Sequence, residues 1–441
     1  MIVPLMEAAA DTCGGKAGAL GALLRAGLPV PDGFVVSYAA YLAAVRDLDV
    51  VRLAGEPDVA RQVLESRPVH ATVVDALRRA LDELGDPPVA VRSSAADEDT
   101  GQASAAGQYE SFLAVRGVGE VADAVRACWA SLFSARAIGY RRDDQPSDDL
   151  VMAVLVQRHV DAEVSGVMFT PAGPDDATRI EASWGLGPSV VGGTVTPDAY
   201  RVAEDGSVTR TVADKRTRLD RHGTRLVIGD VPTGTRDQPT IDDATATQLA
   251  ELGKDIAAVR CEPQDIEWAI VDGRVWIVQA RPVTAAPPPP TSPSSASHTP
   301  ATALTETSAT ALTGTPAATP PGAPGTHGTH GTVTGTLIGT PGSHGTVTGT
   351  ARIVRGPGDF ARVRPGDILV CPFTDPAWTP LLRVAAGVIT EIGGVLSHAA
   401  IVAREHAIPA VLGIPNATST LHDDTVITLD GTNGTVTAAH A

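Results

Sequence analysis

The sequence predicts an α/β (α+β) protein with two folded domains joined by a long flexible linker. Three observations lead to this prediction. Helical and strand-like patterns alternate up to about residue 284, and a stretch rich in Pro, Thr, Ala, Ser and Gly follows. After residue 344, short apolar strands separated by turns surround one clear helix, which is typical of a compact module of about 100 residues.

The expected elements of the first domain follow one another closely. We expect a helix in GGKAGALGALLRAGL, and a strand followed by a helix in VPDGFVVSYAAYLAAV. Strands are expected in ESFLAV, VMAVLVQRHV and VSGVMFT, where apolar residues alternate or run together. DIEWAIVDG and RVWIVQARPV are predicted to form a hairpin, because Asp272 and Gly273 between them are a preferred two-residue turn.

Residues 285–343 are assigned to the linker. Up to Thr329 they are almost only Pro, Ala, Thr, Ser and Gly, and such a stretch cannot bury enough apolar surface to offset its ordering entropy. The heptapeptide HGTVTGT occurs at 330–336 and again at 344–350, and we assign the first copy to the linker and the second to a strand. A metal site at the nearby histidines is disfavoured because Gly-Thr spacing offers no rigid geometry; these are His327, His330 and His344.

The second domain, residues 344–441, is predicted to be a small α/β module. Its expected strands are ARIV, DILVCP, GVITE, AVLG and VITLD, and its one clear helix lies near 398–406.

Composition excludes some classes of partner. With 34 basic and 51 acidic residues the net charge is −17, which argues against nucleic acid or an anionic membrane as a partner. The four cysteines form no CxxC and are expected to be free thiols in a reducing compartment. The N-terminus does not resemble a signal peptide, and no apolar run is long enough to span a bilayer. We therefore expect a cytoplasmic protein.

Several residues of the first domain suit a nucleoside triphosphate, which needs cations, close backbone donors and carboxylates for Mg²⁺. Lys16 follows two glycines at the start of a helix, and Arg92 ends an apolar strand. Small residues around Gly107 let backbone N–H groups approach a phosphate, and Ser111 adds a hydroxyl. Taken singly, each feature fits equally well with a surface lysine, a surface ion pair or an ordinary hairpin.

The predicted hairpin gives a stronger signal. It carries Asp265, Glu267, Gln279 and Arg281, and charge in such apolar runs is costly unless it is paired or bound to metal. Oxygens of Glu267 and Gln279 are expected to hold Mg²⁺, with Arg281 directed at phosphate. The alternative is a buried structural ion pair.

Two regions closely resemble one enzyme family, which comprises phosphoenolpyruvate synthase, pyruvate phosphate dikinase and rifampicin phosphotransferase. Residues 12–284 resemble its ATP-grasp nucleotide-binding domain through GGKAGALGALLRAGLPVPDGFVV, VAVRSSAADED, VSGVMFT, SWGLGPSVVGGTVTPDAY and the hairpin. Residues 344–437 resemble its swivelling phosphohistidine domain through GTARIVRGPGDF and GVITEIGGVLSHAAIVAREHAIPAVLG. The resemblance implies an ATP-grasp domain at 1–284 and a phosphohistidine domain at 344–441, joined by the linker.

The resemblance also implies functions for particular residues. His398 would carry a phosphoryl group, Glu267 and Gln279 would hold Mg²⁺, and the ATP site would comprise Lys16, Arg92, Gly107, Ser111, Gln157, Glu267, Gln279 and Arg281. A neutral imidazole is nucleophilic near pH 7, and its attack on phosphorus gives a phosphohistidine. Gly393 and Gly394 are expected to leave room beside the ring. Leu396 departs from the family pattern, which more often has a polar residue there.

Larger relatives carry a third domain that binds the phosphoryl acceptor, whereas only the linker separates the two regions of this sequence. We expect an ATP-dependent phosphotransferase that passes the phosphoryl group through His398 to a small-molecule acceptor at the interface of the two domains. It would release AMP and pass the γ-phosphate to water or to phosphate. The alternatives are a phosphoryl-donor subunit whose acceptor domain is a separate protein, and a nucleotide-binding regulator without turnover.

Overall fold

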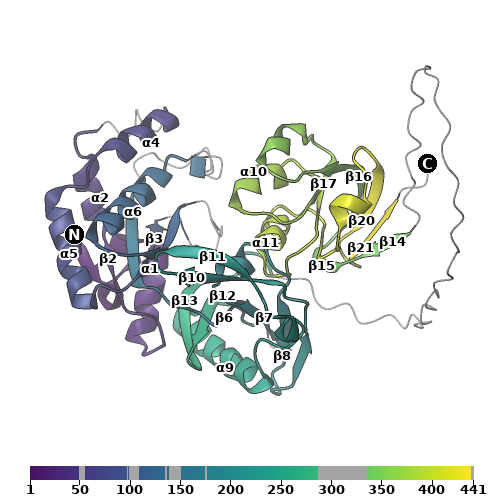
Figure 1. Ribbon diagram of the computed structural model, residues 1–441, viewed down its shortest axis with the longest axis horizontal. Coiled ribbons are helices and arrows are strands. Elements are labelled where there is room, and N and C mark those ends of the chain that lie inside the picture. The colour runs from purple at the N-terminus through teal and green to yellow at the C-terminus, as the bar shows by residue number, and fades with distance from the viewer. Residues whose placement is uncertain are drawn as a thin grey trace, which may run out of the picture.

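The computed structural model describes residues 1–48, 55–96, 98, 109–134, 137–138, 150–173, 176–286 and 335–438. We call residues 1–286 the N-terminal domain and residues 335–438 the C-terminal module. Figure 1 shows the N-terminal domain as two adjoining lobes, with the C-terminal module beside them and α11 facing the second lobe.

The first lobe is an antiparallel sheet covered by helices. Its strand order is β1-β2-β5-β3-β4. The strands are β1 (Ile2–Pro4), β2 (Gly33–Val36), β5 (Met152–Arg158), β3 (Val89–Ala95) and β4 (Ser111–Val115). The helices are α2 (Tyr38–Val45), α4 (Pro57–Ser66), α5 (Ala71–Leu84) and α6 (Val118–Ser131). On α5, Val73, Leu77 and Leu81 recur every four residues, so they share one face and are buried.

The second lobe is a six-stranded antiparallel sheet with the order β13-β12-β6-β7-β8-β9. Its strands are β6 (Val164–Phe169), β7 (Thr178–Trp184), β8 (Asp198–Val202), β9 (Val208–Thr211), β12 (Gln264–Val271) and β13 (Arg274–Pro282). Helix α9 (Asp243–Arg260) covers one face, and the short helix α8 (Pro188–Val191) contacts β6 and β7. A separate hairpin of β10 (Thr217–His222) and β11 (Arg225–Asp230) completes this lobe.

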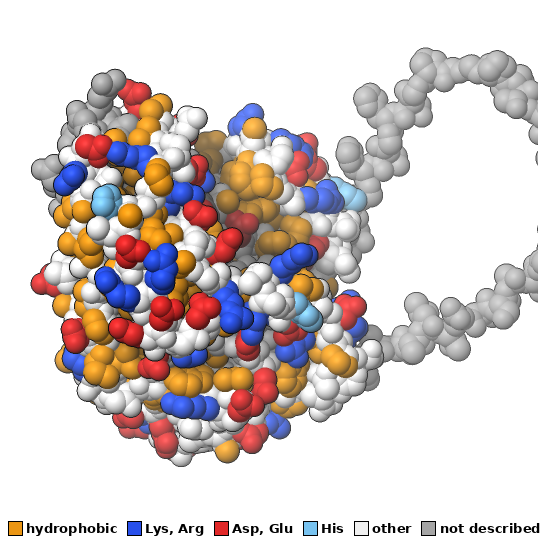
Figure 2. Space-filling view, turned by 60° about the vertical axis from the view of Figure 1, so that its left-hand side comes forward, with side chains coloured by type: hydrophobic (Ala, Val, Ile, Leu, Met, Phe, Trp, Pro, Cys, Tyr) orange, Lys and Arg blue, Asp and Glu red, His pale blue; other side chains and the backbone are white. Residues whose placement is uncertain are grey.

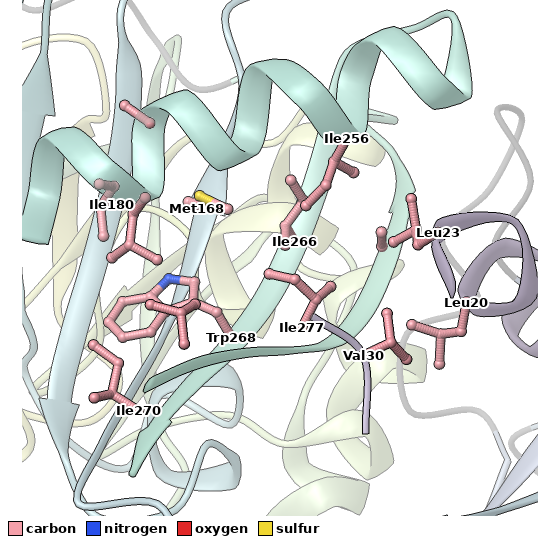
Figure 3. Packing of buried hydrophobic residues seen from close by; sticks show 14 of the residues in the cluster. Leu20, Leu23, Val30, Met168, Ile180, Ile256, Ile266, Trp268, Ile270 and Ile277 are labelled. Carbon is pink, nitrogen blue, oxygen red and sulfur yellow. The ribbon is translucent and has the colours of Figure 1, made fainter. Parts of the chain in front are cut away.

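Helix α1 (Ala10–Arg25) joins the two lobes, since it contacts both β3 and β13. Figure 3 shows its Leu20 and Leu23 reaching the same apolar cluster as Ile256 of α9 and Ile277 of β13. The helix begins four residues before the predicted start and is kinked at Gly14, where φ is 82°. The N-terminal domain therefore has a core that is continuous from α1 to the second sheet.

The predicted hairpin is confirmed. Strands β12 and β13 pair antiparallel, and Asp272 and Gly273 between them have φ of 50° and 68°. Positive φ at both central residues is what a two-residue hairpin turn of the favoured hand requires. The pairing places Glu267 opposite Gln279 and Asp265 opposite Arg281.

The C-terminal module contains an eight-stranded sheet with the order β14-β21-β20-β16-β17-β18-β19-β15. Its strands are β14 (Thr336–Ile338), β15 (Thr340–Ser343), β16 (Thr346–Ile353), β17 (Asp367–Cys371), β18 (Gly387–Thr390), β19 (Ala410–Leu412), β20 (Val426–Asp430) and β21 (Thr435–Ala438). The helices are α10 (Thr379–Leu382), α11 (His398–Glu405) and α12 (Ala417–Thr420). Each predicted strand of this module and the predicted helix are present.

The predicted linker end at residue 343 is too late, because residues 336–343 form β14 and β15 of this sheet. These strands lie at opposite ends of the strand order, although only Gly339 separates them in sequence. The two edges of the sheet therefore meet at Gly339, where a Cβ atom would lie 2.6 Å from the carbonyl oxygen of Leu412. Edge strands rich in Thr and Gly pair mainly through their backbone. Their sequences therefore lack the apolar pattern from which a strand is predicted.

Two further expectations concern cysteines and membranes. All four cysteines are free, with Cys13, Cys128 and Cys371 buried and Cys261 exposed. None of the helices in the described ranges has the length and apolar character needed to cross a bilayer. His327 and His330 lie outside the described residues, and His344 is exposed.

Helix α9 offers a test of the core. Ile256 is fully buried in the apolar cluster, whereas Val259 on the same helix is 39% exposed. Ile256→Ala should lower the free energy of unfolding of the N-terminal domain by about 2–5 kcal/mol, because it leaves a cavity. Val259→Ala should change it by less than about 0.5 kcal/mol. Chemical denaturation followed by tryptophan fluorescence would measure both, and equal effects would contradict this packing.

Candidate nucleotide and phosphohistidine site

A cavity of about 470 Å³ lies between the two lobes of the N-terminal domain. Seven of the eight residues predicted to bind the nucleotide line it, namely Lys16, Arg92, Ser111, Gln157, Glu267, Gln279 and Arg281. The eighth, Gly107, lies outside the described residues. In the space-filling view the surface is hollowed between the N-terminal domain and the C-terminal module (Figure 2).

Lys16 reaches the cavity because α1 lies against β3. At Gly14 a Cβ atom would lie 2.1 Å from the carbonyl oxygen of Ser94, so only glycine allows this approach. The Ser94 hydroxyl donates to the Cys13 carbonyl and accepts from the Ala17 N–H. These contacts fix the turn that carries Lys16.

The ammonium of Lys16 is buried but paired. Its Nζ donates to Glu98 Oε1 at 2.6 Å and to the Ser93 carbonyl at 2.9 Å, and Lys16 is only 5% exposed. A buried charge without such partners would be costly. Lys16 is therefore held in place beside the cavity by a carboxylate that the sequence analysis did not single out.

Arg92 links the two lobes. From β3 its guanidinium donates to the Val278 carbonyl at 2.6 Å and to Gln279 Oε1, both on β13. Its Nη2 lies 3.8 Å from the carboxylate of Glu267. A guanidinium held by a carbonyl and an amide oxygen has a fixed orientation, which suits a residue that recognises phosphate.

The second cation of the hairpin, Arg281, pairs with Asp265. Its Nε and Nη2 lie 2.9 and 2.8 Å from Asp265 Oδ2, and both side chains are less than 10% exposed. The alternative of a buried ion pair thus applies to Arg281, with Asp265 as the partner. Glu267 instead faces Arg92 and keeps 22% of its side chain exposed toward the cavity.

Gln157 and Ser111 occupy different environments. Gln157 is 2% exposed and its Nε2 donates to the Pro31 carbonyl at 3.0 Å, which ties β5 to the chain before β2. Ser111 lies opposite Arg92 in the pairing of β3 with β4 and is exposed. Gln157 therefore shapes the wall, whereas the Ser111 hydroxyl is open to a ligand.

The hairpin supplies oxygen donors that suit Mg²⁺. Glu267 and Gln279 are directly opposite each other, and both line the cavity. Among the described residues there is no group of three or more His, Cys, Asp or Glu that would enclose a metal. Mg²⁺ is usually bound by one or two carboxylates together with waters and substrate phosphates, so the donor set fits an ion that arrives with a nucleotide.

His398 does not line this cavity, but a neighbouring segment of the C-terminal module does. The histidine is the first residue of α11 and is 3% exposed, with Nδ1 3.1 Å from Thr374 Oγ1 and Nε2 3.3 Å from Thr379 Oγ1. Pro376, between these two threonines, lines the cavity. Burial and the charge of Arg281 lower the pKa of His398 to about 4. The imidazole is therefore neutral at pH 7.

Polar and apolar contacts dock the C-terminal module on the second lobe. The carboxylate of Glu181 on β7 accepts from the N–H groups of Val395 and Leu396, at 2.6 and 3.1 Å. Leu396 also packs against Val167 and Phe169 of β6. This packing explains the departure from the family pattern at Leu396, since the side chain is 2% exposed at the junction.

The glycines before His398 have a different use from the one expected. A Cβ atom at Gly394 would lie 2.3 Å from both carboxylate oxygens of Glu181, and one at Gly193 would lie 3.3 Å from Ser397 Cβ. Gly394 thus makes room for the opposing domain and not for the imidazole. Burial raises the pKa of Glu181 to about 7, while its two backbone hydrogen bonds act in the opposite direction.

Arg404 of α11 holds both ends of the segment that joins the domains. It donates to the carbonyls of Ala285 and Gly342, at 3.2 and 2.9 Å, and to the carbonyl of Val395 at 2.8 Å. The Thr284 hydroxyl donates to Glu405 at 2.8 Å beside it. In this docked arrangement, residues on either side of the intervening chain therefore lie next to each other.

Comparison with known proteins agrees with this architecture. Residues 10–299 match the family described as pyruvate phosphate dikinase, AMP/ATP-binding domain, and this match covers more than half of the chain. The chain belongs to this family. Residues 363–434 match a second family, the mobile domain of PEP-utilising enzymes. The family and the α/β fold class predicted from the sequence are thereby confirmed.

Several curated relatives in this family are named as phosphoenolpyruvate synthases. A probable phosphoenolpyruvate synthase of Methanothermobacter thermautotrophicus is 37% identical, over 96% of this chain and 61% of the relative. Archaeoglobus fulgidus has one that is 35% identical over 96% of this chain and 56% of the relative. The phosphoenolpyruvate synthase of Aeropyrum pernix is 33% identical with the same coverage. The chain thus spans 56–61% of the length of these relatives.

Lys16 allows a test of the cavity as a nucleotide site. Lys16→Met should weaken binding of MgATP about tenfold or more, because charged hydrogen bonds to phosphate are lost. Arg25→Met, which removes an exposed cation from the same helix, should leave the affinity unchanged. Isothermal titration calorimetry on the full chain would measure both, and equal affinities for wild type and Lys16→Met would exclude Lys16 from the site.

Proposed function

We propose that this protein is an ATP-dependent phosphotransferase that moves a phosphoryl group from ATP through His398 to a small-molecule acceptor and releases AMP. The observation that carries the proposal is the position of His398. Its imidazole contacts Thr374 and Thr379, and Pro376 between these two residues lines the same cavity as Arg281, in an ATP-binding domain. A nucleophile beside a row of phosphate-binding cations is the arrangement that phosphoryl transfer needs.

The first half-reaction loads the histidine. Lys16, Arg92 and Arg281 bind and orient the phosphates, while Glu267 and Gln279 would hold Mg²⁺, which neutralises phosphate charge when bound. One imidazole nitrogen of His398 attacks the β-phosphorus. The bond between that phosphorus and the oxygen shared with the α-phosphorus breaks, and AMP leaves with the electron pair. This leaves a pyrophosphoryl group on His398. An oxygen of water or of phosphate then attacks the γ-phosphorus, the bond from that phosphorus to the oxygen shared with the β-phosphorus breaks, and phosphohistidine remains.

The second half-reaction transfers the phosphoryl group from His398 to the acceptor. An oxygen of the acceptor attacks the phosphorus, the nitrogen–phosphorus bond breaks and the imidazole recovers its electron pair, while the acceptor loses its proton to solvent. His398 is only 3% exposed when docked, so the acceptor reaches it after the C-terminal module has moved. Apolar packing fills the part of the interface around Leu396, so an acceptor site between the two domains would not lie in that part.

The length and the Pro/Thr/Ala/Gly composition of the linker predicted from the sequence suit such movement. In the docked arrangement the carbonyls of Ala285 and Gly342 both accept hydrogen bonds from Arg404, so these two residues lie close together. A much shorter chain could connect them. A long tether instead lets one domain visit two sites at high effective concentration. We propose this role for the linker, and we propose a reducing cytoplasmic location, which the absence of a CxxC pattern among the four cysteines supports.

The phosphoryl acceptor has two candidates, a small organic molecule and a separate acceptor-binding protein. Relatives named phosphoenolpyruvate synthase suggest a small organic acceptor. The burial of docked His398 also suits a phosphoryl-donor subunit that delivers to a separate acceptor-binding protein. Turnover by the purified chain over a panel of small molecules would favour the first candidate, and labelling without turnover would favour the second.

Labelled ATP tests the loading step. Incubation with Mg²⁺ and ATP labelled at the β-phosphorus should give acid-labile, alkali-stable label on the protein, and His398→Ala should abolish it. His406→Ala, at the other end of the same helix, should retain it. Label from neither the β- nor the γ-position, with ATP still bound tightly, would indicate a regulator instead.

The pH dependence of loading provides a second test. The pKa of His398 is lowered to about 4, so the neutral nucleophile persists as the pH falls from 8 to 5.5. The rate of phosphohistidine formation, measured by rapid quench with saturating MgATP, should therefore stay nearly constant over this range. An imidazole with an ordinary pKa near 6.5 would lose about tenfold in rate at pH 5.5. A tenfold loss would show that His398 is solvated when it reacts.

A further inference from the structure

We infer that Glu181 is a positioning residue that holds the C-terminal module at the nucleotide cavity, so that His398 is in place to be loaded. This inference rests on the proposed function for its consequence, but its geometry stands independently of the chemistry. Glu181 belongs to β7 of the N-terminal domain and does not line the cavity. It therefore acts on the reaction only through the segment that carries His398.

Two hydrogen bonds connect Glu181 to the segment before His398. Glu181 Oε1 accepts from the Val395 N–H at 2.6 Å, and Oε2 accepts from the Leu396 N–H at 3.1 Å. These residues lie three and two positions before His398, directly ahead of the helix that the histidine begins. One carboxylate that grips two successive backbone donors sets both the position and the direction of that segment.

Glu181 and this segment fit together tightly. Glu181 is 3% exposed, and a methyl group at Gly394 would lie 2.3 Å from both of its oxygens. The backbone at Gly193 packs against Ser397 on the other side of the segment. Polar groups buried this closely cannot exchange protein partners for water without separation of the two domains. The contact is therefore made in the docked state and lost in any other.

Charged side chains flank this contact. Arg179 of β7 and Arg404 of α11 both act on Glu181 electrostatically. Arg404 donates to the carbonyl of Val395, while Glu181 accepts from the N–H of the same residue. Val395 is thus held through both of its polar backbone groups. The segment before His398 is fixed by Glu181 from one domain and by Arg404 from the other.

The consequence for the reaction is specific. Glu181→Ala leaves two buried N–H groups without their acceptor, so the docked population should fall. Labelling of His398 by ATP should then slow about 10- to 100-fold, whereas the affinity for MgATP should not change, because the cavity is intact. Glu181→Gln keeps the shape but turns an amide N–H toward a backbone N–H, so it should also slow labelling.

Docking itself can be measured without phosphoryl transfer. At Gly193 and Ser397 the Cβ atoms would lie 3.3 Å apart, close to the separation in a disulfide. Gly193→Cys/Ser397→Cys, oxidised mildly and analysed by mass spectrometry, should form this cross-link readily. Adding Glu181→Ala should reduce the yield several-fold, and adding Glu204→Ala, which removes an exposed carboxylate, should not. Equal yields with and without Glu181 would overturn the inference.

A double substitution tests the contact directly. Gly394→Ala alone should weaken docking, because its methyl group overlaps the carboxylate of Glu181. In the Glu181→Ala background that space is open, so Gly394→Ala should add little. Additive effects would overturn the inference. If docking depends on Glu181 while wild type takes no label from ATP, the positioning role stands and the proposed phosphotransfer fails.

Discussion

The need to pair buried cations is the constraint on which the rest of the structure depends. Lys16, Arg92 and Arg281 come from different elements and line a single cavity, where they would repel one another in a low dielectric. Each is held by an acceptor supplied by the fold, and the principal ones are Glu98, Gln279 and Asp265. The cations are therefore oriented before a ligand arrives, and a polyanion is the ligand that this arrangement favours.

The same constraint connects the cavity to the C-terminal module. Arg281 belongs to the β12–β13 hairpin, and its charge helps to keep the imidazole of His398 neutral. A neutral ring retains the lone pair that a nucleophile uses. The docking contacts combine a small apolar cluster around Leu396 with hydrogen bonds that the C-terminal module donates to Glu181 and to Ala285. Such a mixed junction specifies one orientation while remaining small enough to separate.

Much of the site was visible in the sequence because its residues interrupt patterns that otherwise predict burial. Glu267 and Arg281 stand in apolar strand runs, and Lys16 follows two glycines at a helix start. The partners were not visible for the opposite reason. Glu98 lies in an acidic stretch typical of a surface loop. Glu181 lies in a strand sequence in which nothing indicates a contact with another domain. Asp265 was noted, but its pairing with Arg281 depends on strand register, which the bulge after Glu267 helps to set.

By itself the sequence determined the α/β class, the hairpin at Asp272–Gly273, the family and seven polar residues that line the cavity, since periodicity, turn chemistry and motifs are local properties. Only the tertiary structure decided which acceptor each cation takes, that Gly394 makes room for Glu181, and that residues 336–343 form the two edge strands of the C-terminal module's sheet. Those outcomes depend on contacts between residues far apart in the chain. Their energies come from burial and strand pairing, which no local stretch of residues encodes.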